Sequence, residues 1–117
     1  MAPCSKTELI VVVEDPSVSR LVKAILRRQG KDVVVMEKKA ALKLIENVDE
    51  RVVLLITNQP ETFAGLLGVP PMLYLTSSPD WELASRLPRT RVLQKPFHTQ
   101  ELVDAVRNVT IAQVAAQ

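Results

Sequence analysis

The feature that most constrains this chain is the stretch Leu9–Ser17, which reads LIVVVEDPS. Its apolar, mostly β-branched first half is typical of a strand that is covered on both faces in a parallel sheet. The apolar run stops at two adjacent carboxylates, and Pro16 then favours the start of a helix. This order predicts that Glu14 and Asp15 lie at the carboxyl edge of a sheet, where open α/β sheets bind their ligands.

Composition limits the classes of protein to which the chain can belong. Its 117 residues, of which 47% are hydrophobic, suffice for one domain with one core. The 15 Lys and Arg and the 13 Asp and Glu are scattered, and the aromatic residues are two Phe, one Tyr and one Trp, so we expect no nucleic-acid partner. With Cys4 as its only cysteine, the chain can form neither an internal disulfide nor a four-thiolate metal site. Without a signal-peptide pattern or an apolar run near the roughly 18 residues that span a membrane, it is expected to be cytoplasmic and to bind no membrane.

The rest of the chain alternates between strand and helix patterns. After the first strand, apolar residues at helical spacing predict a helix from Pro16 that ends at Gly30. The further predicted strands are 33–36, 52–56, 72–75 and 91–94, and the further predicted helices are 41–48, a short one within 61–68, 79–87, and a last one capped by Thr99. Five strands alternating with five helices predict one α/β domain over 8–110, with a parallel sheet covered on both faces. Residues 111–117 are expected to extend the last helix or to fray.

Polar residues follow four of the predicted strands at the same edge of the sheet. They are Glu14 and Asp15, then Thr57 and Asn58, then 76–78, and last Lys95. Together, in this order, they suggest a phosphotransfer site.

This arrangement resembles the receiver domain of two-component response regulators, and the resemblance covers about 9–109. It implies a flavodoxin-like, doubly wound (βα)5 fold with strand order 2-1-3-4-5. It also implies that the acid pair Glu14 and Asp15 stands where receivers bind magnesium. Thr76 stands where a hydroxyl senses the phosphate, and Lys95 before Pro96 stands where a lysine contacts it.

The third strand departs from the receiver pattern. Receivers commonly carry the phosphate-accepting aspartate four residues before a proline, and counting back from Pro60 in LLITNQP gives Ile56, which has no group to phosphorylate. The neighbouring Thr57 has a neutral hydroxyl that cannot form an acyl phosphate, and no acidic residue lies between 50 and 61. Val92 also replaces the aromatic residue of many receivers, and the third helix is short. Activation by phosphate on an aspartate is therefore not expected.

The site residues also have purely structural interpretations. Asp15 is expected to cap the first helix while Glu14 pairs with Lys95, and Thr76 is expected to be a satisfied loop hydroxyl. The resemblance implies that the peptide before Pro96 is cis and shapes its turn. Trp81 has two readings that stay open: an exposed anchor for a partner, or a buried side chain that fills the space left by the short third helix.

The function that we expect is that of a pseudo-receiver. Such a module takes part in signalling or regulation by binding a protein partner, has no enzymatic activity, and needs no phosphorylated aspartate. The resemblance implies a partner surface around the fourth helix, fifth strand and fifth helix, and a homodimer through it is a further expectation. The residues expected on this surface are Trp81, Arg86, Arg89, Arg91 and Arg107.

Two rivals remain. One is a metal-dependent receiver in a phosphorelay that accepts a phosphoryl group on Thr57 or Thr76, with help from Lys95. The other is a flavodoxin-like cofactor binder, which is disfavoured because the turn EDPS has no glycine and its acids repel phosphate. We expect no cofactor; the weak candidates for a magnesium ligand are Glu14, Asp15 and Asn58.

Magnesium is expected to bind no better than at millimolar concentration. A receiver site crowds three carboxylates against one lysine, and each like-charged pair about 4 Å apart costs about 1 kcal/mol in water and about 4 kcal/mol at an effective dielectric constant of 20. With Ile56 in place of one acid, both this repulsion and one metal ligand are lost. Titration calorimetry with magnesium chloride measures the affinity, and a micromolar dissociation constant would contradict the expectation.

Overall fold

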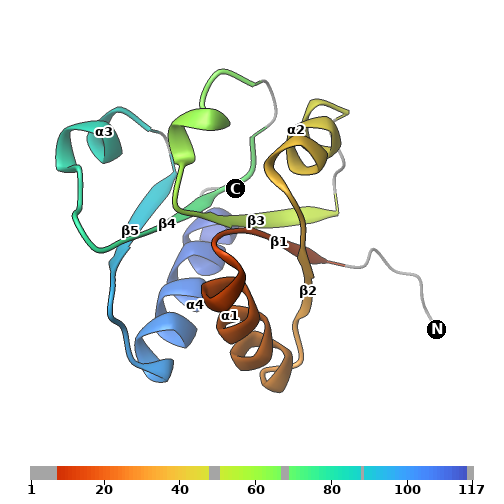
Figure 1. Ribbon diagram of the computed structural model, residues 1–117, viewed down its shortest axis with the longest axis vertical. Helices are drawn as coiled ribbons and strands as arrows, with labels where there is room; N and C mark the ends of the chain where they lie inside the picture. The colour runs from red at the N-terminus through yellow and green to blue at the C-terminus, as the bar shows by residue number, and fades with distance from the viewer. Residues whose placement is uncertain (1–7, 48–50, 67–68, 88, 116–117) are drawn as a thin grey trace.

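The computed structural model describes residues 8–47, 51–66, 69–87 and 89–115, with side chains as far as Val109. Its centre is a parallel sheet with the strand order β2-β1-β3-β4-β5, which confirms the predicted fold (Figure 1). The strands are β1 (Leu9–Val13), β2 (Asp32–Val35), β3 (Val52–Thr57), β4 (Met72–Thr76) and β5 (Thr90–Gln94). The helices are α1 (Pro16–Arg28), α2 (Lys38–Glu46), α3 (Trp81–Arg86) and α4 (Thr99–Ala115).

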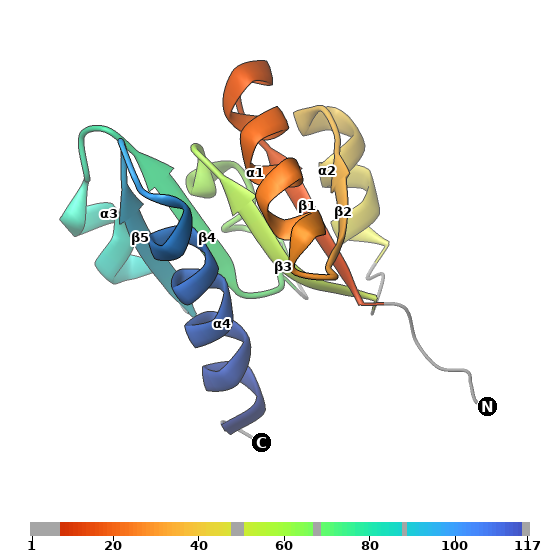
Figure 2. The same cartoon turned by 90° about the horizontal axis from the view of Figure 1, so that it is seen from below.

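Helices cover both faces of the sheet because the central strands are apolar on both sides. α1 and α4 lie on one face, and α2 and α3 lie on the other (Figures 1 and 2). Side chains alternate along each strand, so Leu54 and Ile56 join the cluster under α1 and α4, while Leu55 joins the cluster on the opposite face. The parallel strands also bring the ends of β1, β3 and β4 to one edge.

The third of the five predicted helices is absent from the described residues as an α-helix. A single 3-10 turn, η1 (Pro60–Thr62), stands at this place, although residues 67 and 68 lie outside the description. The prolines at 60, 70 and 71 leave little chain that could continue a helix. Phe63, whose side chain is fully buried, packs in the cluster on this face, where a helix would otherwise supply apolar side chains.

Three helix starts differ from the prediction: α2 begins at Lys38 and not at 41, and the starts of α3 and α4 are set by other capping residues. α3 begins at Trp81 and not at Pro79, since the Asp80 carboxylate accepts a hydrogen bond of 3.0 Å from the Leu83 N–H. α4 includes Thr99 as its first residue, and the Glu101 carboxylate accepts the His98 N–H at 2.7 Å. At its other end α4 continues through 111–115, while 116 and 117 lie outside the described residues.

No helix in the described parts of the chain is both long and apolar enough to cross a bilayer.

Candidate functional site

An ion pair joins the first and last of the turns at the carboxyl edge of the sheet. The Lys95 Nζ lies 2.9 Å from the Glu14 Oε2, although β3 and β4 separate the strands that precede these residues. The Lys95 N–H also donates to the Thr76 carbonyl at 2.8 Å, and the Lys95–Pro96 peptide is cis, as predicted. The predicted pairing of Glu14 with Lys95 is therefore confirmed.

The Glu14 carboxylate is buried, which makes this ion pair unlike one on a surface. The Glu14 side chain is 0% exposed and that of Lys95 is 22% exposed. Glu14 Oε1 accepts the Asp15 N–H at 2.9 Å. Oε2 is paired with the Lys95 ammonium and accepts no further hydrogen bond from the described residues. A buried charge without a partner is costly, and the ammonium of Lys95 is the partner that compensates the Glu14 carboxylate.

Asp15 does not cap α1 with its side chain, and that prediction is wrong. It occupies the N-cap position and is exposed, but its carboxylate makes no capping hydrogen bond. Pro16, at the first helical position, has no N–H to offer, and backbone bonds close the first turn, with the Ser19 N–H donating to the Asp15 carbonyl at 2.8 Å. The Ser19 hydroxyl donates to the Glu14 carbonyl at 3.0 Å.

Ser19 is a site residue that the sequence interpretation missed. It is 1% exposed and fixes the backbone of the acidic turn through its hydroxyl. The available signal was a serine next to Val18 on a helix face that is otherwise apolar, because a buried hydroxyl usually has a nearby polar partner.

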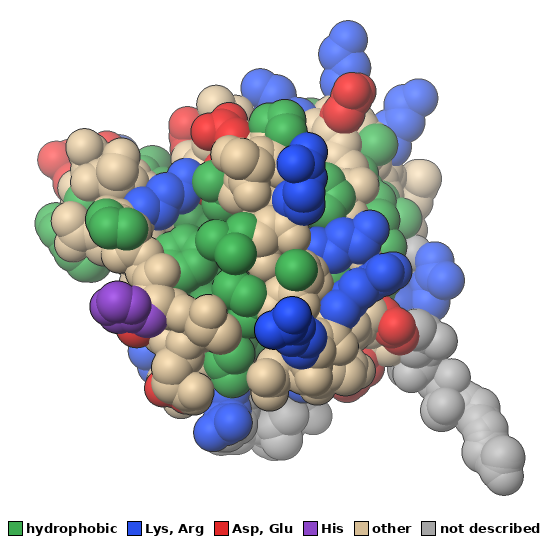
Figure 3. Space-filling view, turned by 60° about the horizontal axis from the view of Figure 1, so that its bottom comes forward, with side chains coloured by type: hydrophobic (Ala, Val, Ile, Leu, Met, Phe, Trp, Pro, Cys, Tyr) green, Lys and Arg blue, Asp and Glu red, His purple; other side chains and the backbone are tan. Residues whose placement is uncertain are grey.

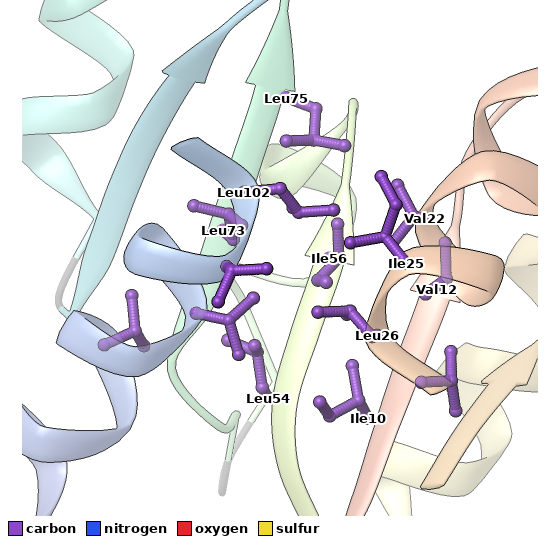
Figure 4. Packing of buried hydrophobic residues seen from close by; sticks show 14 residues of the cluster. Ile10, Val12, Val22, Ile25, Leu26, Leu54, Ile56, Leu73, Leu75 and Leu102 are labelled. Atoms are coloured by element: carbon purple, nitrogen blue, oxygen red, sulfur yellow. The ribbon is translucent and has the colours of Figure 1, made fainter. Parts of the chain in front are cut away.

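At Ile56, which the sequence comparison with receivers aligns with their aspartate, the core continues to the edge of the sheet. Ile56 is 0% exposed and packs among side chains from α1 and α4, near Ile25 and Leu102 (Figure 4). Asp15 and Asn58, two of the weak magnesium candidates, are exposed and half-buried respectively. Across the described ranges, no three His, Cys, Asp or Glu side chains form a group that could hold a metal ion.

The two threonines at this edge hold their own loops. The Thr57 Oγ1 accepts the Gln59 N–H at 3.0 Å, and the Thr76 Oγ1 accepts the Ser78 N–H at 3.1 Å. Thr57 is 0% exposed and Thr76 is half-buried. Both form the local turn that Ser and Thr favour after a strand. For Thr76 this geometry is the satisfied loop hydroxyl that the sequence predicts.

The residues of the predicted partner surface lie on the elements around the edge strand β5. Trp81 is 64% exposed on the first turn of α3, which decides between its two readings in favour of exposure. The arginines are all exposed; they lie on α3, before β5, on β5 and on α4, and are Arg86, Arg89, Arg91 and Arg107. The Arg89 guanidinium donates to the Val69 carbonyl, so it also holds the chain before β4. Because α3 and α4 cover opposite faces of the sheet (Figure 1), the residues on these two helices are divided between the faces and do not form one flat patch.

Comparison with known proteins gives a structural likeness only. No family model and no curated protein matches the sequence. The signal receiver domain of an HD domain-containing protein from Pseudomonas fluorescens matches with a TM-score of 0.77 and 22% identity over 99% of this chain and 96% of that chain. A response regulator receiver domain protein from Bacillus halodurans has a TM-score of 0.70 and 24% identity over 87% and 96%. The receiver domain of the hybrid histidine kinase CckA has a TM-score of 0.66 and 22% identity over 87% and 98%. This chain therefore has the fold of response-regulator receiver domains.

Removing Lys95 is expected to destabilise the domain strongly. The change Lys95→Met leaves the buried Glu14 charge without its ion-pair partner, which is expected to lower the free energy of unfolding by about 3–5 kcal/mol. Adding Glu14→Gln removes that charge and is expected to restore part of the loss, and Lys39→Met, at an exposed lysine of α2, is the matched control. Urea denaturation measures all three variants. Equal stability of Lys95→Met and Lys39→Met would show that the ion pair contributes nothing.

Proposed function

We propose that this chain is a pseudo-receiver, a non-enzymatic signalling module that binds a protein partner without phosphorylation of an aspartate. The observation that carries the proposal is Ile56, an apolar side chain buried in the core at the position where receiver domains carry their acceptor. The receiver fold supports a role in signalling, and Ile56 removes the chemistry that usually controls it.

The charges at the sheet edge support the same conclusion. In a working receiver the lysine after the fifth strand contacts the incoming phosphate. Here the ammonium of Lys95 lies 2.9 Å from a buried carboxylate oxygen of Glu14, and a phosphate would have to compete with that carboxylate. Separating the pair would leave the Glu14 charge buried and uncompensated, so the pair resists opening. Neither phosphate nor magnesium is needed to balance the charges of this edge.

The rival, a metal-dependent receiver that uses Thr57 or Thr76 as acceptor, is less well supported. The Thr57 side chain is fully buried, and its oxygen accepts a loop N–H. Thr76 is more accessible, but its oxygen is engaged in the same way. Attack on phosphorus uses an oxygen lone pair, and in each threonine the N–H of the turn already occupies one of the two.

The partner is proposed to bind around β5. Trp81, on the exposed first turn of α3, has the large apolar side chain that often anchors a protein interface. Arg86 on α3 and Arg91 on β5 are exposed and supply positive charge close to it in sequence. A second copy of the chain is one candidate for the partner, which would make the module a homodimer.

Incubation with acetyl phosphate and magnesium, followed by intact mass spectrometry, is expected to leave the mass of the protein unchanged. A conventional receiver domain treated in parallel shows that the reagent is active. A phosphoryl adduct that survives neutral pH and is lost at alkaline pH would refute the proposal, because an acyl phosphate has these properties. An alkali-stable adduct on Thr57 or Thr76 would favour the rival.

Substitutions around β5 are expected to release the partner. A tagged wild-type protein and its Trp81→Ala and Arg91→Glu variants are used for affinity capture from cell extract, with Lys43→Glu on α2 as a control that makes the same change of charge elsewhere. We expect the wild type and Lys43→Glu to retain the same protein, and the two β5 variants to lose most of it. Equal capture by all four proteins would place the partner surface elsewhere.

A further inference from the structure

The exposed side of α1 is strongly basic. The helix carries Arg20, Lys23, Arg27 and Arg28 and has no acidic residue between Pro16 and its end. Lys31, three residues beyond the end of the helix, is also exposed. In Figure 3, Lys and Arg side chains gather on the right of the face formed by α1 and α4, beside a central apolar area. The basic residues of α1 and the turn after it thus give this side of the molecule a basic surface.

A hollow of about 220 Å³ lies between α1 and α4 beside this surface. Its apolar walls are Leu26 from α1 and Val103 and Val106 from α4, and polar side chains line the rest, namely Gln29, Lys31 and Arg107. A cavity of roughly 150 Å³ already holds benzene, so the hollow is large enough for one Leu or Phe side chain. The hollow therefore offers a binding site for one apolar side chain, with cationic residues beside it.

The end of α1 holds Lys31 beside the hollow. Gly30 adopts a φ of +78°, which a glycine reaches without strain. The Gly30 N–H donates to the Arg27 carbonyl at 3.0 Å, and the Lys31 N–H donates to the Leu26 carbonyl at 3.1 Å. These two bonds form the Schellman motif that ends many helices. Lys31 is thus tied through its backbone to the residue that forms an apolar wall of the hollow.

Apart from Arg107, which is also a residue of the predicted partner surface, the hollow is separate from the sites described above. α1 starts at the carboxyl edge, next to Glu14, and runs back along the sheet, so its last turn lies toward the opposite edge. Trp81 is on α3, which covers the other face of the sheet (Figures 1 and 2). A ligand in the hollow would touch neither the Glu14–Lys95 pair nor the Trp81 side chain.

We propose that the hollow and the basic side of α1 together bind an acidic segment of a partner protein, with one apolar side chain of that segment seated in the hollow. The charge balance supports an acidic ligand. The acids on β2 and α4, which pack against α1, are Asp32, Glu101 and Asp104, and Glu8 precedes β1, against the cations Arg20, Lys23, Arg27, Arg28, Lys31 and Arg107. The surface therefore keeps an excess of positive charge, which attracts acidic partners and speeds their association.

A peptide fits this surface better than a membrane or DNA does. Interfacial membrane binding requires a broad apolar face, and Leu21, which is 50% exposed, is the one large exposed apolar side chain on α1. The DNA backbone would contact the cations but would leave the hollow empty, because it offers only phosphate and sugar. A glutamate-flanked leucine or phenylalanine satisfies both parts of the surface.

Fluorescence anisotropy with a synthetic peptide tests the proposal. The probe is a short fluorescein-labelled peptide with one leucine flanked by glutamates, and its two controls replace the leucine by alanine or the glutamates by lysines. The protein variants are Arg27→Glu with Arg28→Glu, which reverses the charge, and Gln29→Trp, which fills the hollow without changing its buried walls. Lys39→Glu with Lys43→Glu on α2 makes the same change of net charge on the other face. Circular dichroism verifies that each variant is folded.

We expect the wild type and the α2 variant to bind the leucine peptide alike, and the charge-reversal and Gln29→Trp variants to bind it about tenfold more weakly. Both control peptides are expected to bind weakly, and added salt is expected to lower the affinity of the leucine peptide. Equal affinity for the leucine and alanine peptides, or an equal loss in the α2 variant, would overturn the proposal. Tighter binding to duplex DNA or to phosphatidylserine vesicles than to the leucine peptide would also overturn it.

Discussion

Burial of the central strands on both faces is the constraint on which the rest of this structure depends. β1, β3 and β4 carry apolar residues at successive positions, so neither face of the sheet can be left in water. Because the strands are parallel, a crossover joins every pair of consecutive strands, and every strand end that carries a polar residue lies at the same edge. α1 and α4 cover one face of the sheet. α2, α3 and the segment that follows the 3-10 turn η1, which contains the buried Phe63, cover the other face.

The same constraint accounts for the apolar and ion-paired character of this edge. Ile56 extends the core to the end of β3, where an aspartate would have had to keep contact with water or metal. With that acid absent, Glu14 and Lys95 form a buried pair that needs no further ligand. Such a pair joins two distant turns, but the desolvation of both charges offsets much of its attraction. Its main effect is to penalise any state in which one partner is missing, and this favours a single arrangement of the edge.

Sequence reasoning located all five strands and the pairing of Glu14 with Lys95, the resemblance to receiver domains implied the strand order, and the errors were local. The third helix was overestimated because an apolar segment between prolines can be buried as well by one 3-10 turn and Phe63. The cap of α1 was misassigned because an Asp before a Pro usually caps, whereas here backbone bonds and Ser19 close the first turn. Both errors concern which of several nearby groups makes a hydrogen bond or fills a space, and this depends on the neighbours in three dimensions.

The sequence by itself determined the two-sided burial of the sheet, the alternation of strands and helices, and the lack of an aspartate at position 56. These follow from residue type and periodicity along the chain. Only the tertiary structure decided that the Glu14 carboxylate is buried, that Trp81 is exposed, and that a hollow lies between α1 and α4 beside a basic surface. The physical reason is that each of these depends on how closely segments distant in the sequence pack against one another, and periodicity along one segment carries no information about that packing.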